Sequence, residues 1–229
     1  MTKNSARFQR VFLSHPWGPS CPPYAGGEGV SIKPTRSLAA GDSCNAVEFK
    51  APNHIGTHFD FPSHFHPSGK HALNYSPDFF VHDKTLVFWF ETPYGHLIEV
   101  GDLEHALRNY DGDGKETLIL VRSGASLYRH TAQFWQAGPG IAPGVANFLR
   151  KTFSQLTSVG LDSISISSLL HREIGRSVHH EFLCHERPLL IIEDMDLEPL
   201  AARVPHKVIA LPLRLEEGDG APCTVIAEL

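Results

Sequence analysis

The chain has 229 residues, a formal net charge of −5, 41% hydrophobic and 20% charged residues. This is ordinary globular composition, and the length allows a substantial core, so we expect one domain over residues 1–229. The chain has no basic run, and no apolar run is long enough to cross a bilayer, which argues against nucleic-acid and membrane partners. Four scattered cysteines with no CxxC pair, and no signal-peptide pattern at the start, favour a cytoplasmic protein.

Composition and apolar patterning predict more strands than helices. The expected strands cover residues 7–13, 29–36, 43–50, 85–91, 117–123, 158–166, 188–195, 206–215 and 222–229. The expected helices cover residues 103–110 (with Asp102 as N-cap), 142–156 and 174–186. Strands and helices do not alternate regularly and no Gly-rich phosphate loop follows a strand. We therefore expect an α/β fold with a mixed, barrel-like sheet rather than a doubly wound one.

Fifteen histidines are an unusual number for this length, and three of them fall between His54 and His64 in "HIGTHFDFPSH". Pro and Gly make a helix a poor fit there, whereas side chains alternate in an extended segment. One face would then carry His54, Gly56, His58, Asp60 and His64. The other face would carry Ile55, Phe59 and Phe61. Without a cation, the polar face would crowd hydrogen-bonding groups and an anion into a partly dry site, so the spacing favours a metal site.

A complete metal shell needs further ligands from elsewhere in the chain. The segment "VHHEFLCHERPLLIIED" offers His179 and His180 on a predicted helix and Glu193 at the end of a predicted buried strand. These three residues are the candidates, and spacing alone does not choose between the two adjacent histidines.

The run "HIGTHFDFPSHF" resembles the HxGTHxDxPxH signature of the metal-dependent cyclase-like hydrolases, the family of bacterial kynurenine formamidase and isatin hydrolase. The stretches "GDLEHAL", "TLILVRSGAS", "VGLDSISIS", "HHEFL" and "LLIIEDMDLEPL" follow in the family's order. The resemblance implies a swivelling β/β/α domain, assembled as a homodimer or homotetramer. It also implies a hydrolase that cleaves an amide-type C–N bond, in a formamide, lactam or similar small and aromatic molecule.

The same resemblance assigns roles to single residues. His54, His58 and Asp60 would bind one divalent ion, and Asp60 would bridge to a second ion held by His180 and Glu193. His180 fits the family's "HxxL" pattern better than His179, which stays in reserve. His64 would be the catalytic acid–base group. Zinc or manganese suits these ligands, with one or two ions per chain.

Several bulky residues near the motif are candidates for substrate contact: Tyr24, Phe59 and Phe65. Tyr24 stands about where the formamidases carry a tryptophan. Ser123 and Ala125 replace the threonine and tryptophan of the family's "TGWS". Both departures are expected at positions that contact the substrate. The resemblance therefore does not assign kynurenine as the substrate.

Three other interpretations compete with a metal-dependent hydrolase. A cupin is suggested by the HxH pair His64 and His66, although the glutamate that should follow is missing. A catalytically inactive family member could serve as a metal-dependent binding or structural protein. A serine hydrolase is disfavoured because "RSGAS" lacks the GxSxG pattern.

Overall fold

The computed structural model of the chain describes residues 9–229, so the first two residues of the strand expected over 7–13 lie outside it. Each of the nine predicted strands overlaps a strand of the structure, and the last observed strand begins at Gly220, two residues before its predicted range. The strands are β1 (Arg10–Phe12), β2 (Ser31–Arg36), β3 (Ala46–Lys50), β4 (His58–Asp60), β5 (Val81–His82), β6 (Thr85–Trp89), β7 (Leu97–Ile98), β8 (Leu118–Arg122), β9 (Gly140–Ile141), β10 (Ser158–Leu161), β11 (Leu190–Glu193), β12 (Lys207–Pro212) and β13 (Gly220–Glu228). The helices are α1 (Val100–Ala106), α2 (Ala132–Gln136), α3 (Val145–Thr152) and α4 (Arg172–Leu183). The short elements β5, β7, β9 and α2 were not predicted.

The main sheet curls into a nearly closed barrel. Its strand order is β5-β12-β13-β4-β11-β10-β8-β6, with β1 also paired to β13. The two end strands, β5 and β6, are separated in the chain by only two residues, so the ends of the sheet meet. Strands β6, β8, β10 and β11 run parallel, whereas β4, β13, β12 and β5 pair antiparallel. The predicted α/β fold with a mixed, barrel-like sheet is confirmed.

Both faces of the parallel strands are buried, which explains why these strands are apolar all round. In β8, Leu118 and Leu120 belong to the core inside the barrel, and Ile119 and Val121 belong to a second core under the helices. Because successive side chains of a strand point to opposite faces, alternate residues of a strand enter the core inside the barrel, and the residues between them enter the core under the helices. This rule positions the site described below.

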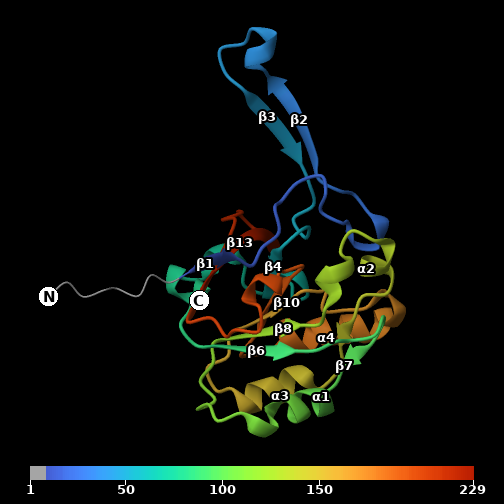
Figure 1. Cartoon of the computed structure of the whole chain (residues 1–229), viewed down its shortest axis with the longest axis vertical. Helices are drawn as coiled ribbons and strands as arrows, with labels where there is room; N and C mark the ends of the chain where they lie inside the picture. Colours follow the sequence, from blue (N-terminus) through green and yellow to red (C-terminus); the bar gives the residue numbers. More distant parts are fainter. Residues whose placement is uncertain (1–8) are drawn as a thin grey trace, which may run out of the picture.

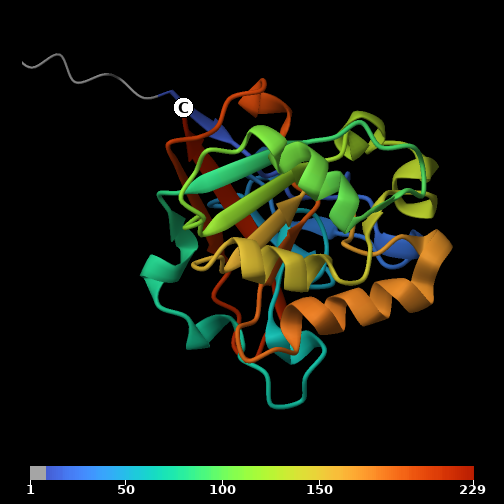
Figure 2. The same cartoon turned by 90° about the horizontal axis from the view of Figure 1, so that it is seen from below.

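Helices α1, α3 and α4 cover the outer face of the barrel. Figure 2 shows α3 and α4 as neighbours outside the strands. The helix predicted over residues 142–156 corresponds to the shorter α3. Val145, Leu149 and Phe153 of this segment are buried in the outer core, and Phe148 is partly buried against it. The expected role of Asp102 is wrong: Glu99 is the N-cap of α1, and Asp102 is the third helical residue, whose Oδ2 accepts the Glu99 N–H at 2.8 Å.

Strands β2 and β3 form a separate two-stranded hairpin. Figure 1 shows it standing away from the body of the molecule. Every residue of β2 is exposed, as are four of the five residues of β3. Within residues 9–229, no helix is long and apolar enough to span a membrane.

Candidate metal centre and active site

The centre of the site comes from two neighbouring strands of the barrel. Strands β4 and β11 pair antiparallel, with His58 opposite Glu193 and Phe59 opposite Ile192. Phe59 and Ile192 point into the barrel. Because neighbouring side chains of a strand point to opposite faces, His58, Asp60 and Glu193 point outward, towards the helices. All three are buried, and one ligand atom of each lies within 4.8 Å of the others.

Helix α4 adds the fourth group, and it is His179. The Nε2 atom of His179 lies 3.7 Å from both Asp60 Oδ2 and Glu193 Oε1. His180, which the family pattern favoured, is exposed and does not join the cluster. Adjacent helical residues point about 100° apart, and His179 is on the buried face that also carries Gly175, Val178 and Phe182. The structure therefore places the reserve candidate, not His180, against the two acids.

The spacing of these groups suits a small cation. The Nε2 atom of His58 lies 3.4 Å from Asp60 Oδ1 and 3.5 Å from Glu193 Oε2. These distances, like those of His179, are longer than typical hydrogen bonds. Around an ion with ligand bonds of about 2.0–2.1 Å, tetrahedral ligand atoms stand roughly 3.3 Å apart. Histidine nitrogens and carboxylate oxygens at this spacing fit a divalent metal.

Hydrogen bonds to the backbone orient both imidazoles. The Nδ1–H of His58 donates to the carbonyl of Gly56 at 2.8 Å, and that of His179 donates to the carbonyl of Gly175 at 2.8 Å. Each bond fixes the tautomer, so the lone pair of Nε2 faces the carboxylates. This is the arrangement that a metal-binding histidine requires.

Glu193 is fixed by two donors and by the chain that follows it. Its Oε1 accepts the N–H of Ile166 at 2.6 Å and the hydroxyl of Ser165 at 3.1 Å. The next residue, Asp194, has a left-handed backbone (φ 52°) and a buried bidentate ion pair with Arg129, at 2.7 and 2.6 Å. These contacts leave Oε2 of Glu193 directed at His58.

The acids and histidines strongly perturb one another. Burial by itself would lower the pKa of His58, but the carboxylates of Asp60 and Glu193 outweigh burial and raise that pKa to about 9. Burial acts to raise the pKa of Asp60, yet the rings of His54 and His58 hold it well below its usual range. The cluster thus attracts positive charge, and a divalent ion would bind there by displacing protons.

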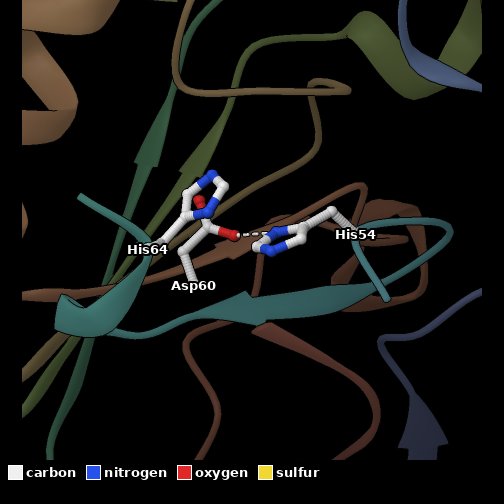
Figure 3. Close-up of side chains that lie close together, drawn as sticks. All are labelled: His54, Asp60 and His64. Carbon is white, nitrogen blue, oxygen red and sulfur yellow. Dashed lines mark hydrogen bonds and ion pairs between the residues drawn. The ribbon is translucent and has the colours of Figure 1, made fainter. Parts of the chain in front are cut away.

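A second group of side chains adjoins the first through Asp60. The Nδ1 atom of His54 lies 2.7 Å from Asp60 Oδ1, and Figure 3 shows the side chains of His54 and His64 close to that carboxylate. His64 comes from a 3-10 turn, Pro62–His64, and its ring stacks on that of His54 with centroids 4.1 Å apart. The predicted single extended face is therefore only partly correct: the strand covers His58–Asp60 alone, but the histidines converge nonetheless.

Sequence reasoning missed Asp219, which precedes β13. Its Oδ2 accepts a hydrogen bond from Nδ1 of His64 at 2.7 Å and lies 3.2 Å from Nε2 of His54. Burial acts to raise the pKa of Asp219, but His64, His54 and Asn53 lower it on balance. No local pattern marks this aspartate, because it lies 155 residues from His64 in the sequence.

These groups open on a cavity of about 330 Å³. Two of the three predicted substrate-contact residues, Tyr24 and Phe65, line it. Phe59 does not line it. It lies between His58 and Asp60 in the strand, so its side chain points the other way and is fully buried inside the barrel. Ser123 and Ala125 are also buried away from the cavity, and Ser123 bonds to Asp162. Of the departures from the family pattern, only the one at Tyr24 reaches the cavity.

The cupin interpretation is wrong. His66 is exposed, and its Nδ1 accepts the backbone N–H of Ser68. It lies outside the cavity that His64 lines. The pair His64 and His66 therefore does not share a site.

Comparison with known sequences identifies a family. A cyclase family model matches residues 11–168. The chain belongs to the cyclase family. Within this family it is 26% identical to kynurenine formamidase from Bacillus cereus over 216 residues, covering 94% of this chain and 95% of that protein. It is 28% identical to kynurenine formamidase from Geobacillus thermodenitrificans over 201 residues, or 88% of each chain.

Solved structures of the cyclase fold superpose on the chain. Isatin hydrolase A from Ralstonia solanacearum has a TM-score of 0.78 at 20% identity, covering 97% of this chain and 92% of that one. A protein described as a "potential metal-dependent hydrolase with cyclase activity" has a TM-score of 0.71 at 21% identity, covering 97% and 98%. At these identities the likeness establishes the fold, and the site has to be argued from the residues of this chain.

Proposed function

We propose that the protein is a metal-dependent hydrolase that cleaves an amide-type C–N bond, in a formamide, lactam or similar small aromatic molecule. The observation that carries this proposal is the convergence of His58, Asp60, Glu193 and His179 at the base of a cavity that His64 also lines. Relatives named kynurenine formamidase and isatin hydrolase support the same bond type and substrate size.

The proposed metal ligands are His54, His58, Asp60, Glu193 and, in place of His180, His179. Their nitrogen and oxygen donors suit zinc or manganese, and Asp60 lies between two groups that could serve one or two ions. When bound, such an ion supplies a nucleophilic hydroxide at neutral pH and polarises a carbonyl.

His64 is the proposed acid–base residue. Its Nδ1–H donates to Asp219, which fixes the tautomer with a free lone pair on Nε2. His64 would take a proton from the attacking water and return it to the leaving nitrogen. Groups of this kind typically contribute about 10²–10⁴-fold in rate. Tyr24 and Phe65 would hold the aromatic part of the substrate in the cavity.

A hydrolysis screen with paired metal analysis tests this proposal. N-formylaryl amines, isatin-type lactams, cyclic imides and aryl esters are offered to protein loaded with zinc or manganese. We expect Asp60→Ala and His179→Ala to lose metal and turnover, whereas His180→Ala, the matched control on the next residue, keeps both. We expect His64→Asn to retain metal while turnover falls about 10²–10⁴-fold.

Other outcomes would count against the enzyme. A metal-loaded protein that cleaves none of these classes would be an inactive family member with a binding or structural role. Full turnover by metal-free protein would contradict the role of the ion, and a wild-type rate in His64→Asn would contradict the acid–base role.

We further propose a homo-oligomer, a dimer or tetramer, located in the cytoplasm. The hairpin of β2 and β3 supports assembly because it exposes apolar side chains away from the body. The four cysteines are free thiols, as a reducing compartment would keep them.

A further inference from the structure

Helix α4 presents more than His179 to the cavity. Arg172, Arg176 and His179 are spaced i, i+4 and i+7, so they share one face of the helix, and all three line the cavity. His179 is buried beside the acids, whereas both arginines are exposed. The helix therefore contributes both to the proposed metal site and to a pair of guanidinium groups at the mouth of the same cavity.

Neither guanidinium is neutralised by a strong partner. Among residues 9–229, the side chain of Arg172 has no hydrogen-bond or ion-pair partner. Arg176 has one weak contact, 3.9 Å from Glu173, and both of those side chains are largely exposed. The carboxylates that line the cavity are already engaged, Asp60 and Glu193 with histidines and Asp194 with Arg129. The mouth of the cavity thus carries excess positive charge in a chain of net charge −5.

The part of the cavity wall that adjoins α4 is polar. A Cβ on Gly175 would lie 2.1 Å from the Cβ of Ser167, so the glycine lets α4 pack directly on the segment that carries Ser165 and Ser167. Both serines line the cavity, and Ser167 lies 3.5 Å from the hydroxyl of Tyr24. A bound molecule would meet hydroxyl groups on this wall and two cations on the helix.

We propose that Arg172 and Arg176 form a carboxylate-binding subsite, so that the preferred substrates are aryl amides or lactams that carry a carboxylate on the part directed away from the metal cluster. The inference rests on the proposed function for the identity of the scissile bond. A guanidinium binds a carboxylate through two parallel N–H···O bonds, which a neutral group of the same shape cannot accept equally well.

Matched substrates test the subsite. Formamidobenzoates are compared with the corresponding nitroformanilides, whose nitro group has the shape of a carboxylate without its charge. We expect the ratio of kcat/KM, carboxylate over nitro, to fall about tenfold for each of Arg172→Gln and Arg176→Gln, mainly through KM. Lysine at either position should restore part of the ratio, and added salt should lower it in the wild type. Arg108→Gln, an exposed arginine outside the cavity, should leave it unchanged.

An unchanged ratio of kcat/KM, carboxylate over nitro, in the Arg172→Gln/Arg176→Gln double variant would overturn the proposal. The same holds if both substrates are cleaved more slowly by the same factor, because that result would mean only that the helix is disturbed. Calorimetric binding of aminobenzoate and nitroaniline to metal-loaded protein needs no turnover. If no substrate of any screened class is cleaved, the proposed function fails, and the binding ratio alone decides the subsite. That ratio should fall in the double variant, and an unchanged binding ratio would overturn the subsite independently.

Discussion

Two adjacent residues before and at the start of β13 set the positions of both histidines that flank Asp60. Asp219 accepts the hydrogen bond from His64, and Gly220 leaves space for the ring of His54. A Cβ on Gly220 would lie 2.2 Å from Cε1 and 2.6 Å from Nε2 of that ring. Gly220 lies directly opposite Asp60 in the strand pair. A residue without a side chain is needed there so that the His54 ring can lie beside Asp60.

Replacing Gly220 with alanine should weaken metal binding. The added methyl group would push the His54 ring away from Asp60, and we expect at least a tenfold loss of zinc affinity, in line with changes to groups that orient metal ligands. Chelator competition measures the affinity. Gly101→Ala is the control, because nothing lies within 4 Å of its added Cβ. Wild-type affinity in Gly220→Ala would show that His54 is not a ligand or that its ring has another position available.

At this scale the sequence predicted the motif residues but not their supports. His58, Asp60 and Glu193 were recognisable from spacing and from an acid that ends an apolar strand. The choice between His179 and His180 depended on which helical face packs inward, and Gly175, Val178 and Phe182 mark that face only once the packing is known. Asp219 acts across 155 residues, and short-range pattern carries no information about such a contact.

Among the elements, β4 shows why an alternating pattern was only partly reliable. The predicted alternation of His58, Phe59 and Asp60 between two faces is observed, because these three residues form a strand that pairs with β11 and β13. Before them, Gly56 has a φ of 69° and bends the chain, and after them Pro62 starts a 3-10 turn. His54 and His64 reach Asp60 through these bends rather than through the alternation of a strand. Their convergence was therefore predicted from a partly incorrect backbone.

Strand β5, which closes the barrel, carries a buried histidine that makes stability depend on pH. His82 is 1% exposed, its Nδ1 lies 3.1 Å from the Thr117 hydroxyl, and burial lowers its pKa to about 4. The ordinary pKa of histidine is about 6.5, so between these values the unfolded chain binds a proton that the folded chain does not. The free energy of unfolding should therefore decrease as pH falls from about 6.5 to about 4.

His82→Phe should remove most of this contribution, about 3 kcal/mol across that window by linkage. Urea denaturation at several pH values, in the presence of a chelator, compares the variant with the wild type. Burial also lowers the pKa of His15 to about 4, so part of the slope should remain. His66→Phe, at an exposed position, should follow the wild-type slope. Identical slopes in the wild type and His82→Phe would contradict the role of His82.

For the whole molecule, the predicted barrel-like sheet followed from many apolar strands and few helices, but its closure did not. The ends of the sheet meet because β5 and β6 are consecutive in the chain, and β5 has only two residues, too few to show a pattern. The hairpin of β2 and β3 was predicted as two strands, but its projection from the body could not be read from strand composition. That projection bears on the assembly.

One face of the hairpin is apolar although the described chain leaves it largely exposed. Ile32 pairs with Phe49 and Pro34 pairs with Val47, and alternate pairs of this kind share a face. Val47 and Phe49 are each 61% exposed. An isolated two-stranded hairpin is marginally stable in water, so a surface of this composition gains most from being covered by another chain. A second copy of the chain is the partner that a homo-oligomer supplies.

Val47→Lys should therefore shift the protein towards the monomer, because a charge would be buried in the contact between copies. Light scattering coupled to size-exclusion chromatography, over a range of protein concentrations, measures the change. Glu48→Lys places the same side chain on the opposite, polar face of the hairpin and should keep the wild-type mass. Zinc content should stay the same in both variants, since none of the proposed metal ligands lies in the hairpin. A wild-type protein that is monomeric at all concentrations would contradict the assembly, and an unchanged oligomer in Val47→Lys would place the contact elsewhere.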